Sequence, residues 1–179
     1  MAEVVLFHHA QGLTAGCLAF AGELRAAGHM VHTPDLYEGR TFATLSEGMA
    51  YAQEVGFGTI IERGEAAAVG TDLVYAGFSL GVMPAQKLAM TRPGARAAVF
   101  MHAAVPLRYF GGDWPESVPL QIHVMEDDEL GDVDVARSIE QAELHLYPGD
   151  RHLFTDSSLA DYDADATALV LERVLGFLR

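Results

Sequence analysis

One serine of this 179-residue chain stands in a pattern that could make it a nucleophile. Gly77-x-Ser79-x-Gly81 lies between an apolar run at 71–76, readable as a buried strand, and a helical pattern at 80–90. A strand that turns at once into a helix holds its corner residue at positive φ, and small residues two positions before and after relieve the crowding. We therefore expect Ser79 to project at the carboxyl end of a strand, where a helix N-terminus favours negative charge. The alternative is a glycine-rich turn without chemistry.

A serine hydroxyl needs a base to take its proton, and a histidine oriented by a carboxylate is the usual base. At such a turn the chain order is serine, acid, histidine, each on a loop at the carboxyl end of a strand. His152 lies between the last predicted strand and the last helix, which is the required place. His123 and His145 fall inside predicted strands, and His102 precedes any acid-bearing loop. His152 is therefore the predicted base, and a loop histidine without a role is the alternative.

The acid is expected directly after the predicted strand at 120–125. Four acidic residues crowd there: Glu126, Asp127, Asp128 and Glu129. A solvated acidic turn accounts for most of them, but one of them is expected to orient His152. We rank Asp128 first, Asp127 second and Glu126 third.

The tetrahedral intermediate of acyl transfer needs two N–H donors for its oxyanion. One is the N–H of Leu80, directly after the nucleophile, and the other is expected near Ala10, in the loop after the first strand. His9 and Gln11 stand in that same loop. His9 either lines the substrate pocket or is an ordinary loop histidine, and the same choice holds for its neighbour His8.

A long predicted loop at 103–118 carries the only tryptophan, Trp114, together with Phe110. These aromatic side chains either line the acyl pocket or cap the edge of the sheet. Of the residues outside the nucleophile, base and acid, His9, Gln11 and Trp114 are the candidates for the substrate pocket.

Strands and helices alternate along the whole chain, which is typical of a parallel sheet with helices on both faces. The predicted strands are 4–7, 29–35, 71–76, 95–101, 120–125 and 143–147. The predicted helices are 15–27, 46–69 with a break near 56–58, 80–90, 133–142 and 164–179. No repeat or linker interrupts the pattern, so residues 1–179 are expected to form one α/β domain. Pro84 is expected to tighten the start of its helix.

Composition excludes several classes of protein. Eleven basic against 25 acidic residues give a net charge of −14, which argues against nucleic acid and anionic membranes as partners. Cys17 is the only cysteine, so an internal disulfide is impossible. Eight histidines show no clean metal-ligand spacing, so no metal or cofactor is expected. The first residues lack a basic n-region, and we expect a soluble, cytoplasmic protein; monomer and homodimer both remain open.

With these residues in hand, the chain resembles the dienelactone hydrolase family of the α/β-hydrolase superfamily. Five local patterns in the expected order carry the resemblance: His9-Ala10-x-Gly12-Leu13, then Pro34-Asp35-Leu36-Tyr37 with Gly39 and Thr41-Phe42, Gly77-Phe78-Ser79-Leu80-Gly81, His123-Val124-Met125-Glu126-Asp127-Asp128, and Tyr147-Pro148-Gly149-x-x-His152-x-Phe154. The resemblance implies a three-layer α/β-hydrolase fold with about six strands and no lid domain. It also implies a triad of Ser79, Asp128 and His152, with an oxyanion hole from the N–H groups of Ala10 and Leu80.

Three departures from the family bear on the substrate. The enzyme that names the family uses a cysteine nucleophile, where this chain has Ser79. By alignment His9 replaces a glutamate that pairs with the resting thiol, and Asp156 replaces an arginine that binds the substrate carboxylate. The resemblance therefore implies hydrolysis of an ester, lactone or thioester but not of an anionic dienelactone. The alternative is a non-catalytic small-molecule binding protein with the same fold.

Overall fold

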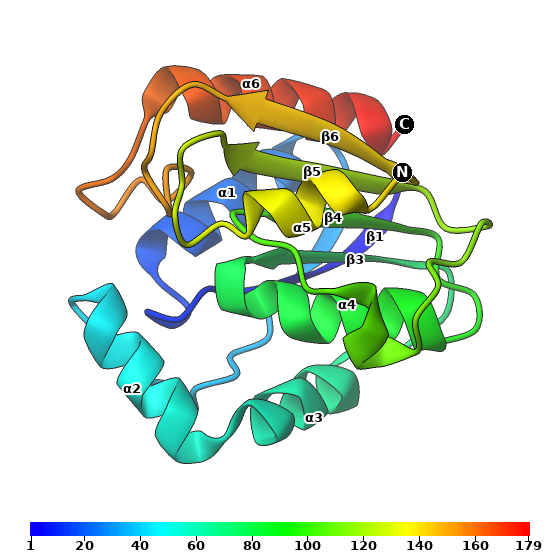
Figure 1. The fold of residues 1–179 in the computed structure, drawn as a ribbon, viewed down its shortest axis with the longest axis horizontal. Helices are drawn as coiled ribbons and strands as arrows, with labels where there is room; N and C mark the ends of the chain where they lie inside the picture. Colours follow the sequence, from blue (N-terminus) through cyan, green and yellow to red (C-terminus); the bar gives the residue numbers. More distant parts are fainter.

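The computed structural model describes all residues 1–179, and a six-stranded parallel sheet forms its centre (Figure 1). The strand order is β2-β1-β3-β4-β5-β6, and every neighbouring pair is parallel. The strands are β1 (Glu3–Phe7), β2 (Met30–His32), β3 (Leu73–Phe78), β4 (Ala97–Met101), β5 (Leu120–Met125) and β6 (Ala142–Tyr147). The predicted parallel sheet is confirmed. The second strand is shorter than predicted, since Pro34 has no N–H to give to the ladder.

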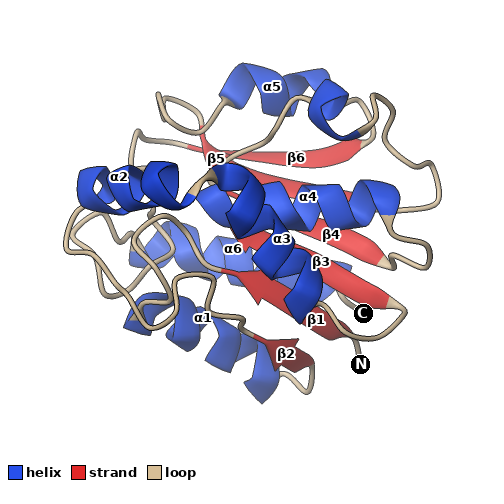
Figure 2. Cartoon of the chain, turned by 90° about the horizontal axis from the view of Figure 1, so that it is seen from below, coloured by secondary structure: helices blue, strands red, loops and turns tan.

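Helices cover both faces of the sheet (Figure 2). They are α1 (Ala15–Ala26), α2 (Leu45–Val55), α3 (Phe57–Ala67), α4 (Val82–Thr91), α5 (Val133–Ser138) and α6 (Ala164–Phe177). α1 and α6 pack on one face, around a core that includes Phe20 and Val170, whereas α3, α4 and α5 pack on the other, around a core that includes Ile60 and Val82. No helix is both long and apolar enough to span a bilayer.

The predicted break in the helix at 46–69 is confirmed. α2 ends at Val55, Gly56 follows with a φ of 92°, and α3 begins at Phe57. A residue with a side chain rarely adopts this φ, so the glycine allows the chain to turn between the two helices. α2 therefore stands away from the sheet and beyond the end of β3, where it forms a wall of a cavity described below (Figure 1).

The order in which strands are added to the sheet changes direction between β1 and β3. After β1 the chain passes through α1 to β2 on one side, and after β3 it passes through α4 to β4 on the other. The loops at the carboxyl ends of β1 and β3 therefore diverge. In open α/β sheets this switch point is where ligands bind.

Candidate active site

Ser79 occupies a sharp turn between β3 and α4. Its φ is 49°, and a short 3₁₀ turn, Ser79–Gly81, leads into α4. The turn is possible because Gly77 and Gly81 have no side chain: a Cβ on Gly77 would lie 2.7 Å from the Val82 nitrogen, and one on Gly81 would lie 2.6 Å from the His8 carbonyl oxygen. α4 starts at Val82 and not at residue 80 as predicted, because the 3₁₀ turn takes up Leu80 and Gly81. Ser79 is thus held in the strained, projecting position that the sequence predicted.

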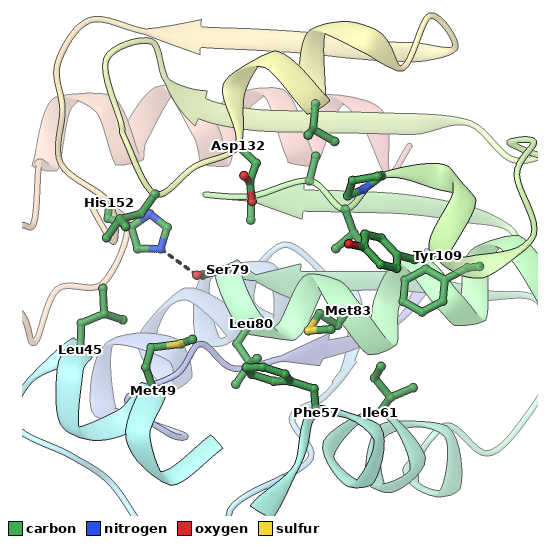
Figure 3. A pocket seen from close by; sticks show the side chains of 17 residues that line it. Leu45, Met49, Phe57, Ile61, Ser79, Leu80, Met83, Tyr109, Asp132 and His152 are labelled. Atoms are coloured by element: carbon green, nitrogen blue, oxygen red, sulfur yellow. Dashed lines mark hydrogen bonds between the residues drawn. The ribbon is translucent and has the colours of Figure 1, made fainter. Parts of the chain in front are cut away.

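The structure brings Ser79, His152 and Asp128 together. The Ser79 hydroxyl lies 2.7 Å from His152 Nε2, and His152 Nδ1 lies 2.7 Å from Asp128 Oδ2 (Figure 3 shows the Ser79–His152 bond). Both His152 and Asp128 are buried, with 7% and 4% of their surfaces exposed. The N–H of Leu130 donates to the other Asp128 oxygen at 2.9 Å, so the carboxylate is fixed from both sides. A serine, a histidine and a carboxylate connected in this order are the parts of a nucleophilic hydrolase site.

The neighbouring acids do not reach His152. Glu126 and Asp127 are exposed, and their backbone N–H groups bond to the Tyr147 and Gly149 carbonyls. Only Asp128 turns inward, because the next turn leaves space for it: a Cβ on Gly131 would lie 2.8 Å from Asp128 Oδ2. The geometry thus favours Asp128 over the two alternatives that the sequence left open.

The sequence predicts that the backbone N–H groups of Ala10 and Leu80 bind the oxyanion. The Ala10 N–H makes no backbone hydrogen bond. Leu80 lies at the start of a helical turn, where N–H groups lack intrahelical partners. The close approach of Gly81 to the Phe7 and His8 carbonyls brings the loop of Ala10 next to this turn. Both predicted donors therefore belong to neighbouring turns.

A cavity of about 610 Å³ opens beside Ser79 and His152. Thirteen of its 17 lining residues are hydrophobic, and they come from α2, α3, α4, the loop after β4 and the segment before α5 (Figure 3). Representative members are Met49, Phe57, Met83 and Tyr109. No lysine or arginine lines it. The cavity suits an apolar group bound next to the serine.

Of the three residues predicted for the pocket, none lines this cavity. Trp114 is buried in the core, where it packs edge-on against Phe100 and donates its ring N–H to the Val118 carbonyl at 2.7 Å. Gln11 borders a smaller cavity of about 200 Å³ on the other side of His152. Phe110, the second aromatic residue weighed in the long loop, does line the main cavity.

His9 is buried against Asp156, a residue 147 positions away in the sequence. His9 Nε2 lies 2.6 Å from Asp156 Oδ2, and Thr14 donates its hydroxyl to the same oxygen at 2.5 Å. Ser158 donates its hydroxyl and its N–H to the other oxygen, at 2.5 and 2.9 Å. The positions aligned with the glutamate and the arginine of the enzyme that names the family are here a histidine and an aspartate in contact. His9, Cys17 and Asp156 are also the only three potential metal ligands whose donor atoms lie within 4.8 Å of one another.

Hydrogen bonds favour the charged forms of both His9 and Asp156. Burial disfavours charged His9, but hydrogen bonds with Asp156 and Cys17 outweigh burial and raise the pKa of His9 to about 9. Burial likewise disfavours charged Asp156, but its hydrogen bonds with His9, Ser158 and Thr14 lower its pKa to about 2. The Gln11 N–H donates to His9 Nδ1 at 3.2 Å. This bond forms only when Nδ1 carries no proton, so it opposes the rise in the pKa of His9. The pair joins the loop of Ala10 to the loop of His152.

Two further buried histidines support these loops. His8 donates from Nδ1 to the His9 carbonyl and accepts the Leu36 N–H at Nε2, and burial lowers its pKa to about 4. It is a neutral structural residue that does not line the cavity. His102, at a φ of 70°, lies with Nε2 2.7 Å from the hydroxyl of Thr155, three residues after His152. Burial lowers the pKa of His102 well below its usual value.

Several residues around Ser79 are not marked by any local sequence pattern. α2 and α3 approach the cavity only through tertiary packing, so Met49 and Phe57 carry no local pattern that marks them. Asp132, in the acidic segment after β5, also lines the cavity without a local pattern that marks it.

A model of the dienelactone hydrolase family matches residues 1–179. No curated protein matches the chain at the sequence level. Among solved structures, a dienelactone hydrolase-like promiscuous phosphotriesterase from metagenomic libraries has a TM-score of 0.72 at 20% identity, with 99% of this chain and 85% of that chain covered. A dienelactone hydrolase from Anabaena variabilis has a TM-score of 0.67 at 17% identity, covering 100% and 88%. A thioesterase domain from the curacin biosynthetic pathway has a TM-score of 0.66 at 16% identity, covering 97% and 90%. These structures share the fold of this chain.

Proposed function

Since the chain belongs to the dienelactone hydrolase family and is a hydrolase acting on ester bonds, we propose that it cleaves a carboxylic ester, lactone or thioester through an acyl-enzyme on Ser79. The observation that carries this proposal is the unbroken chain of hydrogen bonds from Ser79 through His152 to Asp128, which ends at an apolar cavity. A small-molecule substrate is the partner that such a cavity fits.

The first half-reaction forms the acyl-enzyme. Ser79 Oγ attacks the carbonyl carbon while its proton passes to His152 Nε2, 2.7 Å away. Asp128 holds the imidazole with its other proton on Nδ1 and stabilises the imidazolium that forms. The oxyanion accepts the N–H groups of Ala10 and Leu80. His152 then gives its proton to the leaving alcohol or thiol, and the carbonyl re-forms on Ser79.

The second half-reaction releases the acid. Water enters beside His152, gives it a proton and attacks the acyl carbon, and collapse of the second tetrahedral intermediate returns that proton to Ser79. The apolar cavity holds the acyl or alcohol group during both steps. The oxyanion donors are backbone groups of turns that close packing of Gly81 fixes, so they need no reorganisation during the reaction.

The proposal is tested with p-nitrophenyl butyrate and the variant Ser79→Ala. We expect kcat/KM to fall by about 10⁴-fold or more, because the variant has no nucleophile. Ser117→Ala, at an exposed loop serine far from the cavity lining, is the matched control and is expected to keep wild-type turnover. Equal turnover in wild type and Ser79→Ala, or none in the wild type on any activated ester, would contradict the proposal and favour a binding protein.

A further inference from the structure

Asp132 brings the only carboxylate into the apolar cavity. Apart from His152, every other lining residue is uncharged, and no cation faces Asp132 there. In Figure 3, His152 and Ser79 lie on one side of Asp132, and Tyr109 lies on the other. No hydrogen bond or ion pair involves its side chain, although the carboxylates of Asp128 and Asp156 each have several partners.

The local backbone explains why this carboxylate is free. Asp132 is the residue before α5, a position where an aspartate usually accepts a backbone N–H of the helix. Here it has a φ of 50° and a ψ of 44°, and its side chain makes no capping bond. Its carbonyl accepts the Ala136 N–H at 3.0 Å, which starts the helix. The left-handed backbone thus points the carboxylate away from the helix and toward the cavity. Asp132 is an exposed residue at the mouth of the cavity. The buried part of its surface raises its pKa, the charge of His152 opposes this rise, and the charge of Asp128 adds to it.

The charges around Asp132 have the same sign. It also borders an adjoining cleft lined by Glu126, Asp127, Glu129 and Asp134, in which Arg137 is the only basic residue. The chain carries a net charge of −14. An anionic substrate is therefore repelled at this mouth, whereas a cationic group on the substrate would replace the missing partner of Asp132.

We propose that Asp132 is a specificity-determining residue that selects esters or thioesters carrying a quaternary or protonated ammonium group, at the expense of neutral and anionic analogues. The inference rests on the proposed function, because it concerns the substrate of the same site. Asp132 acts by contact with the substrate cation. Apolar side chains around it, such as Tyr109 and Phe110, contact the alkyl substituents of that group.

Matched pairs of substrates that differ only in one charge test this inference. Butyrylthiocholine is compared with 3,3-dimethylbutyl thiobutyrate, which places carbon where the cation has nitrogen. The p-nitrophenyl esters of 4-(trimethylammonio)butyrate and 5,5-dimethylhexanoate make the same comparison with the charge on the acyl side. We expect kcat/KM of the cationic member to be about two- to fivefold higher in at least one pair, which is the effect of one contact between exposed charges.

The variant Asp132→Asn is expected to reduce that ratio to near one and to leave turnover of the neutral member within about threefold. Asp134→Asn removes the same charge two residues away, from a side chain that lines the neighbouring cleft and not the cavity, and it should keep the wild-type ratio. Ratios near one in both pairs of the wild type, or equal effects of the two variants, would overturn the inference. Absence of turnover by the wild type on all four substrates would instead count against the proposed function, so the two failures are distinguishable.

Discussion

Two histidine–aspartate pairs share the loop that follows β6 but differ in their surroundings. His152–Asp128 has a separation of 2.7 Å and His9–Asp156 one of 2.6 Å, and His152 and Asp156 are only four residues apart on one loop. Only the first pair has a serine hydroxyl at its free nitrogen and a cavity beside it. The second pair is closed on all sides. Both pairs therefore have a short bond between a histidine and a carboxylate. They differ because only His152–Asp128 contacts a nucleophile and a cavity that a substrate can enter.

Both members of the closed pair have strongly shifted pKa values. His9 is raised to about 9 and Asp156 lowered to about 2, although neither lines the main cavity. Asp156 accepts hydrogen bonds at both oxygens, from His9 and Thr14 on the first loop and from Ser158 on its own loop. The bonds from His9 and Thr14 hold the loop of His152 against the first loop. Strongly perturbed groups can mark functional sites, but structural ion pairs perturb pKa values as well. In this molecule the open pair is assigned to chemistry and the closed pair to support of the fold.

The largest expected effect that separates the pairs is on turnover. Asp128→Asn should lower kcat/KM by about 10³- to 10⁴-fold, because the amide no longer holds the His152 proton on Nδ1. Asp156→Asn removes the same charge from the same type of pair and should cost at most about tenfold. The check is steady-state hydrolysis of p-nitrophenyl butyrate by both variants. Similar losses in the two variants would break the distinction between the pairs.

The order of the two variants should be reversed for stability: Asp156→Asn should destabilise the fold more than Asp128→Asn. Asp156→Asn leaves His9 buried without its anion, and we expect the free energy of unfolding to fall by about 3 kcal/mol. Asp128→Asn keeps an oxygen for the Leu130 N–H and should cost about 1 kcal/mol or less. Urea unfolding of both variants, followed by circular dichroism, measures the difference. A larger loss in Asp128→Asn would refute the assignment of the closed pair to the fold.

A smaller effect is expected on the pH dependence of stability. Asp156 has a lowered pKa, so its contribution is complete above its ordinary value of 3.8 and is lost as the pH falls through about 2. His9 has a raised pKa, so its contribution is complete below 6.5 and is lost as the pH rises through about 9. The pair thus stabilises the fold fully between pH 3.8 and 6.5.

The variant His9→Gln sharpens this prediction. Its free energy of unfolding should lack the alkaline decline between pH 6.5 and 9 that we expect for the wild type, because glutamine does not titrate. Urea midpoints at half-unit steps of pH give the profile. An identical decline in both proteins would assign it to other groups and contradict a charged His9.

The residues that local patterns constrain were predictable from sequence. Ser79 is marked by two glycines that the turn requires, and His152 is marked by its place between the last strand and the last helix. The parallel sheet also followed, because alternating strands and helices leave few other arrangements. Asp128 could be ranked above Asp127 but not identified with certainty from the sequence. Adjacent acidic residues in one turn have the same sequence pattern and differ only in where their side chains point.

The remaining features depend on long-range packing. The contact between His9 and Asp156 spans 147 positions, and no local pattern in the sequence marks it. Trp114 was expected to line the pocket or cap the sheet edge, and it packs in the core because its ring N–H finds a carbonyl there. The role of Asp132 depends on a left-handed backbone that turns its side chain toward the cavity, which composition does not reveal.

The central claim is that Ser79 is activated by His152 and not by the closed pair. Its most direct test is the rate of labelling by a fluorophosphonate, with the modified peptide located by mass spectrometry. The account predicts one adduct, on Ser79, formed about 10³-fold or more slowly in His152→Asn and within about tenfold of the wild-type rate in His9→Asn. An adduct on another residue, or an equal loss of labelling in the two histidine variants, would contradict it.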